Sequence, residues 1–319
     1  MKRLAFLFGI VLLFSACARP AVDAHGCYRD MDSALAASKK NGHNIVVIAT
    51  MDGDDEQSSA FIKRVVGTED FVNVTSQFSV VHMDFSKKTY DSTVAENEED
   101  KKAVKIAAKN ENILKHNILT AKLLNISLTP SFFLMTKDGC FVSNIEYIEE
   151  INSSSDFLKA ISKYDSEAQR INELVQRSRT GSAEERLQAI NELYDTTESI
   201  YRPFLMPFID SAISLASKSG NLEQKSKYLM ARTDTFSTQS FLNGNTSDAV
   251  ENYVKLAGEK SLTAEYRQQA WYMAGYLLAM SESSQYDTII TYLQNAVNAA
   301  PDSKDAAAIQ RAINEIGGR

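Results

Sequence analysis

The sequence predicts an α/β domain over residues 27–165, followed by an all-α domain of helical hairpins over residues 166–319. Short apolar runs rich in β-branched residues, typical of buried strands, occur in the first half between helical patterns. From residue 166 onward these runs disappear, and apolar residues recur at the 3.6-residue period of a helix. About 300 residues with 44% apolar content are also enough for two domains of ordinary size.

The first 16 residues have the layout of a secretory signal peptide. Lys2 and Arg3 precede an apolar run that ends at Phe14, and the small residues Ser15 and Ala16 follow. The apolar run is about half of the roughly 20 residues that a membrane-spanning helix requires. We therefore expect an exported protein.

The segment Leu13-Phe14-Ser15-Ala16-Cys17 resembles the lipobox of bacterial lipoproteins. The resemblance implies that Cys17 becomes the lipid-modified first residue, followed by a linker over residues 17–26. Such boxes usually place the leucine one position later, so cleavage after Ala18 or Ala24, with release of a soluble product, stays open. Arg19 stands where an inner-membrane retention signal would have aspartate, which favours the outer membrane over the inner membrane.

Without Lys2 and Arg3 the chain has 32 basic and 41 acidic side chains, a formal charge of −9. Phosphate binding requires a basic surface, so the composition argues against nucleic acid as a partner. No second long apolar run occurs in the sequence. We expect a water-soluble chain held at the membrane through lipid on Cys17.

The first elements of the α/β domain form a helix, a strand, a helix and a strand. A helical pattern over residues 29–40 ends at Asn41-Gly42, which suits a helix C-terminus. Residues 44–49 are apolar on consecutive positions and predict a strand buried on both faces. A helix over residues 58–66 and a second buried strand over residues 78–84 complete a βαβ unit.

The remaining elements of this domain are a long helical insertion and a hairpin. Residues 103–124 predict one broken helix or two consecutive helices. Strands are expected at residues 131–135 and 141–145, because Asp138-Gly139 between them favours a hairpin turn. A helix over residues 155–164 closes the domain.

In order and spacing, these landmarks resemble the thioredoxin fold of exported bacterial proteins. Asn44–Ala49, Thr50–Ser59 and Ala60–Val66 match the strand, the active-site loop and the helix of that family, and Val80–Asp84 matches its second strand. Its proline-led strand is matched by Thr129-Pro130-Ser131 through Asp138-Gly139.

The redox cysteines of that family would fall near Asp55 and Ser58, with Glu56 and Gln57 between them. Thiol–disulfide exchange requires a thiolate and a resolving thiol, which a carboxylate and a hydroxyl cannot replace. The resemblance therefore implies a domain without oxidoreductase activity. We expect the chain not to be an enzyme, since no other catalytic motif or nucleophile–base pair is evident.

The acidic loop itself, Asp54-Asp55-Glu56-Gln57-Ser58, has two interpretations. Negative charge at a helix N-terminus contributes about 0.3–1 kcal/mol, which is a sufficient structural reason for these residues. The alternative is a calcium site, but the loop lacks the alternating ligand spacing of an EF-hand. The four histidines are also far apart in the sequence. We expect no metal and no cofactor.

Thr129-Pro130 is a candidate cis peptide, because the family holds this proline cis beside its active-site loop. The resemblance also implies that the backbone here pairs with an extended peptide, which needs no cysteine. A proline kept only for its turn is the alternative.

Cys27 and Cys140 are expected at opposite ends of the domain, which favours two buried free thiols over a disulfide.

The C-terminal half predicts seven to nine antiparallel helices separated by short breaks, and Ser182 with Glu185 forms a capping box. The last hairpin resembles a tetratricopeptide repeat through Trp271, Gly275 and Leu278 on one helix, followed by Ala296 and Pro301. The aromatic residues of this hairpin are expected mainly in core packing, with some available to line a concave peptide groove. They are Tyr266, Trp271, Tyr272 and Tyr276.

These features favour a non-catalytic envelope lipoprotein that binds a protein or peptide through both domains. One alternative is a thioredoxin-family folding or redox-associated factor that acts through other residues. A purely structural spacer near the membrane is another.

Overall fold

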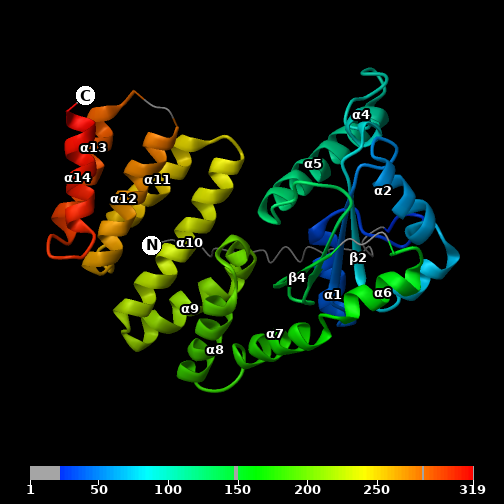
Figure 1. The fold of residues 1–319 in the computed structure, drawn as a ribbon, viewed down its shortest axis with the longest axis horizontal. Coiled ribbons are helices and arrows are strands. Elements are labelled where there is room, and N and C mark those ends of the chain that lie inside the picture. Colours follow the sequence, from blue (N-terminus) through cyan, green and yellow to red (C-terminus); the bar gives the residue numbers. More distant parts are fainter. Residues whose placement is uncertain (1–21, 147–149, 282–283, 319) are drawn as a thin grey trace, which may run out of the picture.

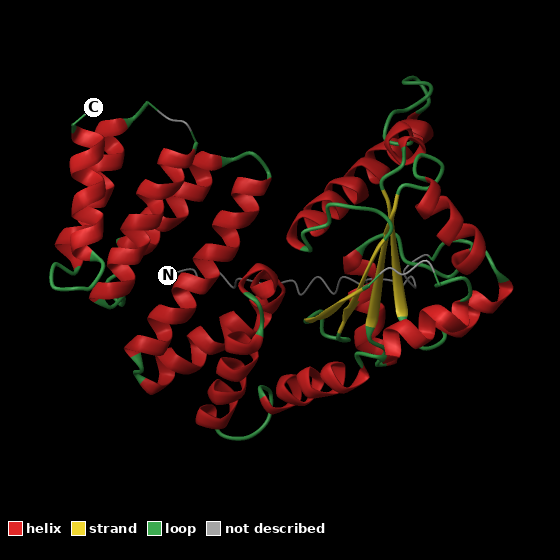
Figure 2. Cartoon of the chain, in the orientation of Figure 1, coloured by secondary structure: helices red, strands yellow, loops and turns green. Residues whose placement is uncertain are grey.

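The computed structural model describes residues 22–146, 150–281 and 284–318. The predicted signal peptide and Cys17 lie outside these residues. A small mixed sheet flanked by helices is followed by a region built only of helices (Figures 1 and 2). The predicted succession of an α/β region and an all-α region is confirmed. None of the helices in the described ranges has the length and hydropathy that crossing a membrane requires.

The sheet has the strand order β2-β1-β3-β4. The strands are β1 (Ile45–Thr50), β2 (Ser79–Asp84), β3 (Ser131–Met135) and β4 (Phe141–Ile145). β1 pairs parallel with β2 and antiparallel with β3, and β3 pairs antiparallel with β4. All of β1 is buried, as its consecutive apolar residues predicted.

Helices cover both faces of this sheet. Asp30 caps the first helix, and Gly42 ends it in the left-handed conformation, with a φ of 80°. The helical elements of this region are α1 (Met31–Asn41), α2 (Glu56–Phe61) with its π-helical continuation η1 (Ile62–Val66), η2 (Glu69–Phe71), α3 (Val72–Thr75), α4 (Lys87–Asp91), α5 (Lys101–Leu123) and α6 (Ser154–Ser162).

The expectation of a broken helix or two helices over residues 103–124 is wrong, because α5 is one continuous helix of 23 residues. The carboxylate of Asp100 accepts hydrogen bonds from the backbone N–H groups of Lys102 and Ala103 and fixes its start. Glu111 and Asn112 interrupt the apolar pattern, but both are exposed and leave the helical backbone intact.

Each face of the sheet has its own core. On one face, three aromatic rings pack against one another: the ring centroid of Phe132 is 4.5 Å from that of Phe61 and 5.1 Å from that of Phe157, and the latter two are 5.3 Å apart. This core continues without interruption into the helical region as far as Ala231. On the other face, side chains of β1, β2 and β3 pack against Ala34 of α1 and Leu124.

The C-terminal region consists of eight α-helices and one 3-10 helix within the described residues, which agrees with the predicted seven to nine helices. The capping box between Ser182 and Glu185 is present. These elements are α7 (Asp165–Arg177), α8 (Ala183–Thr196), η3 (Ser199–Leu205), α9 (Met206–Ser219), α10 (Leu222–Leu242), α11 (Thr246–Ala257), α12 (Ala264–Met280), α13 (Tyr286–Ala299) and α14 (Ala306–Gly317).

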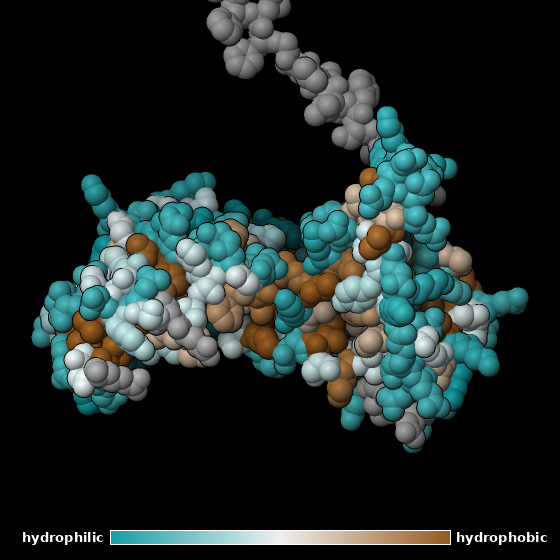
Figure 3. Space-filling model, turned by 90° about the horizontal axis from the view of Figure 1, so that it is seen from above, coloured by the Kyte–Doolittle hydropathy of each residue, from teal (hydrophilic) through white to brown (hydrophobic). Residues whose placement is uncertain are grey.

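The helical region is joined to the sheet region by direct contacts. Phe141 of β4 stacks on Tyr201 of η3 with ring centroids 3.5 Å apart and an interplanar angle of 12°. The ammonium of Lys122 donates a 2.6 Å hydrogen bond to the backbone oxygen of Leu242, at the end of α10. In the view from above, hydrophobic surface gathers in the middle of the molecule, between the two regions (Figure 3).

Candidate functional site

The carboxyl end of β1 leads into a tight loop that ends at Asp55, the N-cap of α2. The Asp55 carboxylate accepts hydrogen bonds from the backbone N–H groups of Gln57 and Ser58, at 3.4 and 3.0 Å. It also accepts a 2.5 Å hydrogen bond from the Ser58 hydroxyl. Ser58 is fully buried, and its oxygen accepts a hydrogen bond from the backbone N–H of Met51. The two residues therefore stabilise the loop together.

Thr129 and Pro130 lie beside this loop, because β3 runs antiparallel to β1 and pairs Ala49 with Ser131. The Thr129–Pro130 peptide bond is cis. The Thr129 hydroxyl donates a 3.3 Å hydrogen bond to the same Asp55 oxygen that Ser58 contacts. Four of the residues singled out from the sequence thus meet at one end of the sheet.

The pKa of Asp55 is lowered from its ordinary value. Partial burial raises this pKa, but the hydrogen bonds from Ser58, Gln57 and Thr129 stabilise the carboxylate and together outweigh it. Asp55 is therefore ionised at neutral pH and acts as a hydrogen-bond acceptor. The side chains of Glu56 and Gln57 are exposed to solvent.

Two further carboxylates at this end of the sheet, those of Asp54 and Asp84, also accept hydrogen bonds from nearby groups. Asp54 accepts a hydrogen bond from the backbone N–H of Lys87, at the start of α4. Asp84, at the end of β2, accepts hydrogen bonds from the hydroxyls of Ser86 and Thr89, each at 2.5 Å, and from the backbone N–H of Asp52. In the described residues, no three His, Cys, Asp or Glu side chains are grouped as a metal site.

Cys27 and Cys140 are both free and buried. Burial raises the pKa of the Cys27 thiol well above its ordinary range. Burial also raises the pKa of the Cys140 thiol, to about 12, although the Thr136 hydroxyl partly opposes the shift. Both thiols are protonated at neutral pH, so neither has the character of a nucleophile.

A groove of about 1020 Å³ lies between α12, α14 and the loop that joins α13 to α14. Tyr266, Tyr272 and Met273 line it from α12, and Pro301 lines it from the loop. Tyr272 and Tyr276 are 37% and 45% exposed and stack on each other with ring centroids 6.2 Å apart. The expectation that these two tyrosines lie mainly in the core is therefore wrong.

The remaining residues of the helical signature hold α12 against α13. Trp271 stacks on Tyr292 with ring centroids 5.6 Å apart, and Trp271 and Leu278 both pack against the buried cluster that contains Leu293. A Cβ atom on Gly275 would lie 3.2 Å from Leu293, so the absence of a side chain allows the close approach of the helices. Ala296 is completely buried in the same contact.

Sequence reasoning missed Gln268, which is 4% exposed. Its amide nitrogen donates hydrogen bonds to the backbone oxygens of Ala296 and Ala300, at 3.2 and 2.9 Å. Its amide oxygen accepts a 2.6 Å hydrogen bond from the Ser303 hydroxyl. Gln268 therefore ties the loop after α13 to α12 and fixes one wall of the groove.

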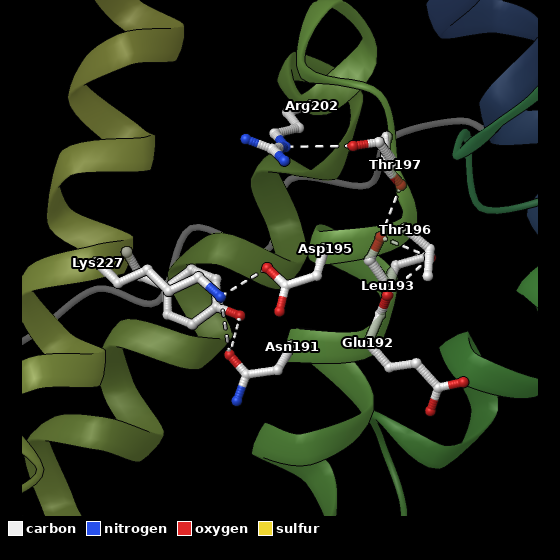
Figure 4. Close-up of polar contacts among 9 residues, drawn as sticks. Asn191, Glu192, Leu193, Asp195, Thr196, Thr197, Arg202 and Lys227 are labelled. Carbon is white, nitrogen blue, oxygen red and sulfur yellow. Dashed lines mark hydrogen bonds and ion pairs between the residues drawn. The ribbon is translucent and has the colours of Figure 1, made fainter.

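A third polar cluster joins α8 to α10 (Figure 4). The Lys227 ammonium contacts Asp195 at 2.8 Å, and the Tyr228 hydroxyl donates to Asn191 at 2.7 Å. The Arg202 side chain donates to the backbone oxygen of Thr197 at 3.2 Å. The Lys227 and Tyr228 contacts join α8 to α10, and the Arg202 contact joins η3 to the end of α8, so we assign the cluster a structural role.

A family described as an uncharacterised protein C-terminal domain matches residues 224–318. The matched segment runs from α10 to α14 and includes the groove and Gln268. No curated protein and no solved structure matches the chain.

Proposed function

We propose that this chain is a non-catalytic envelope lipoprotein that binds a protein or peptide. In this proposal, a redox-inactive thioredoxin-like domain precedes a tetratricopeptide-like helical region, and lipid on Cys17 attaches both to a membrane, the outer one being favoured. The observation that carries it is the hydrogen-bonded pair of Asp55 and Ser58, at the positions where the resemblance implies a cysteine pair.

Several features support the thioredoxin-like part of the proposal. β1 and β2 form a parallel pair connected through α2, and β3 and β4 form an antiparallel hairpin followed by α6. Pro130 lies beside the loop that begins α2, as the resemblance implies. A peptide bound beside Thr129 would meet Leu128, which is 77% exposed.

The helical region supports binding in a second way. Adjacent helices from α9 to α14 pack against one another in sequence order, the arrangement by which helical repeats build an extended groove. Gly275 and Ala296 allow the close contact of α12 and α13, and the groove opens beside it.

Site-specific photo-crosslinking in intact cells tests the binding proposal. A photoreactive residue at position 128 reports on the Thr129–Pro130 region, and one at position 272 reports on the groove. The matched control is position 72, since Val72 is also exposed, at 62%, but belongs to α3, which packs against η2, α6 and β2 and does not line the groove. We expect discrete adducts from positions 128 and 272 and none from position 72. The absence of adducts at both test positions would favour the spacer hypothesis.

Insulin reduction tests the redox-inactive assignment. We expect no thiol-dependent turnover, because the only thiols in the described residues are buried and protonated. Turnover that survives in the Cys27→Ser/Cys140→Ser variant would point to a folding factor acting through other groups. For the anchor, a Cys17→Ser form that still partitions with membranes would contradict lipidation.

A further inference from the structure

We propose that the groove between α12 and α14 binds an extended, basic peptide segment in which Lys or Arg alternates with apolar residues. This inference rests on the proposed peptide-binding function and specifies its ligand class. It follows from three properties of the groove: its unpaired carboxylates, its exposed aromatic side chains and its rigid wall.

The rim of the groove is acidic. Four carboxylates line it, Glu223, Glu265, Asp302 and Asp305, against the single cation Lys304. Within the described part of the chain, none of the four forms an ion pair or a side-chain hydrogen bond. Other carboxylates of the chain do form ion pairs, such as that of Glu167 with Arg170, at 2.7 Å. The rim carboxylates thus remain available to a ligand.

The positive N-terminal ends of nearby helices neutralise only part of the negative charge of these four carboxylates. Glu223 and Glu265 lie in the first turns of α10 and α12, and Asp305 is the N-cap residue of α14, although its side chain does not cap the helix. Each helix N-terminus supplies about half a positive charge. Three such ends and Lys304 offset about 2.5 of the four negative charges, so the rim stays negative.

The walls of the groove suit the apolar and cationic parts of such a segment. Tyr266 and Met273 present apolar surface from α12, and Ile309 and Ala312 present it from α14. The exposed ring of Tyr272 lies at the groove and stacks on Tyr276. A Lys or Arg side chain over such a ring gains a cation–π contact in addition to its attraction to the carboxylates.

The groove is formed before a ligand arrives. Gln268 holds Ala296, Ala300 and Ser303 together, and the Ser303 oxygen accepts a hydrogen bond from the backbone N–H of Ala306. The loop that carries Asp302 and Asp305 is thereby fixed against α12. A preformed site loses less conformational entropy on binding, which favours measurable affinity for a short peptide.

Calorimetric titration of the purified chain tests this inference with three heptapeptides. The basic probe is Lys-Leu-Lys-Tyr-Lys-Leu-Lys, and in the other two Gln or Glu replaces every Lys. We expect saturable 1:1 binding of the basic peptide that weakens as salt is raised, and no binding of the acidic one. Glu265→Gln/Asp302→Asn should weaken binding about tenfold, as expected for the loss of two partly exposed charge contacts.

The control variant Glu98→Gln/Glu99→Gln makes the same change in net charge on an exposed turn outside the groove. It should bind as the wild type does, and an equal loss in this control would overturn the inference in favour of non-specific attraction. Equal binding of the Gln peptide would also overturn it while leaving peptide binding intact. If no peptide binds but position 272 gives crosslinks in cells, this inference fails and the proposed function stands. If no peptide binds and position 272 gives no crosslinks, both this inference and the proposed binding function of the groove fail.

Discussion

The hydroxyl of Ser58 donates a 2.5 Å hydrogen bond to the carboxylate of Asp55, one helical turn earlier. The same carboxylate oxygen is within hydrogen-bond distance of the Ser58 backbone N–H and the Thr129 hydroxyl. This single side chain therefore connects the start of α2 to the start of β3. Its role is to hold two segments in place, and the following predictions begin with it.

Replacing Asp55 with Ala should lower the free energy of unfolding by about 1–2 kcal/mol, because α2 loses its N-cap. Chemical denaturation in urea measures this change. Glu56→Ala is the matched control, since it removes the same charge from the next residue, which is exposed. An equal loss of stability in both variants would contradict the specific capping role of Asp55.

The contribution of Asp55 should depend on pH. Its pKa is lower in the folded chain than in the unfolded chain, where it is about 3.9. The stabilisation is therefore fully present above the unfolded value and is lost as the pH falls through the folded value. Urea unfolding of wild type and Asp55→Asn between pH 7 and pH 2.5 should show their difference shrinking at the acidic end. A constant difference would exclude this linkage.

Gly275→Leu should destabilise the chain by about 1–3 kcal/mol, because added side-chain atoms have no room between α12 and α13. A Cβ alone would already lie 3.2 Å from Leu293 and 3.5 Å from Tyr292. Ala279→Leu, an exposed position on the same helix, should change stability by less than about 0.5 kcal/mol. Thermal or urea unfolding measures the stability of both variants. Similar losses of stability at the two positions would contradict the close packing of α12 and α13 at Gly275.

Gln268→Leu should lower the free energy of unfolding by about 2–4 kcal/mol. The two backbone oxygens and the Ser303 hydroxyl that it contacts would lose their buried partner, and each such loss costs about 1–3 kcal/mol. The neighbouring Gln269 is exposed, so Gln269→Leu serves as the control in the same urea titration. A stable Gln268→Leu variant would show that the loop is held by other contacts.

Asp234→Asn should stabilise the chain at neutral pH. Burial raises the pKa of Asp234, although the Tyr253 hydroxyl, which donates to it at 2.7 Å, and Arg202 oppose the shift. Above the unfolded pKa of about 3.9, the folded state binds more protons, so stability falls as the pH rises through the folded value. The asparagine removes that dependence and keeps an acceptor for Tyr253.

Melting curves at pH 7 and pH 4 provide the measurement, and the advantage of Asp234→Asn should be smaller at pH 4. Tyr253→Phe tests the same contact from the other side, because it leaves the carboxylate without its donor. It should destabilise by about 1–3 kcal/mol at pH 7. An Asp234→Asn variant that is less stable than wild type at pH 7 would contradict the cost of the buried charge.

The order of strands and helices was predictable because buried parallel strands carry consecutive apolar residues. The predicted strand over residues 44–49 is displaced from β1 by one residue at each end, and the one over residues 78–84 begins one residue before β2. The hairpin at Asp138-Gly139 was also predictable, since Gly139 has a φ of 83° in the turn. The loop residues Asp55 and Ser58 and the pair Thr129-Pro130 could be identified through their place in this order.

The features that were not predicted from the sequence depend mainly on contacts between residues far apart in the chain. Gln268 contacts residues 28 to 35 positions away, so nothing in its local pattern marks it as buried. Helix α12 carries apolar residues on nearly every side, so its pattern does not distinguish a core face from an exposed one, and the expectation of core positions for Tyr272 and Tyr276 was wrong. The sequence did not predict that α5 is one continuous helix, because exposed polar residues interrupt its apolar pattern.

The stacked rings of Phe141 and Tyr201 join two regions that the sequence describes separately, and the core that begins on the sheet runs on to Ala231. Such a chain should melt as one cooperative unit. By thermodynamic linkage, a ligand bound to the helices then raises the midpoint at which the sheet unfolds. Slower hydrogen exchange in the strands would therefore show that a ligand is bound to the helices, even when the ligand does not contact the strands.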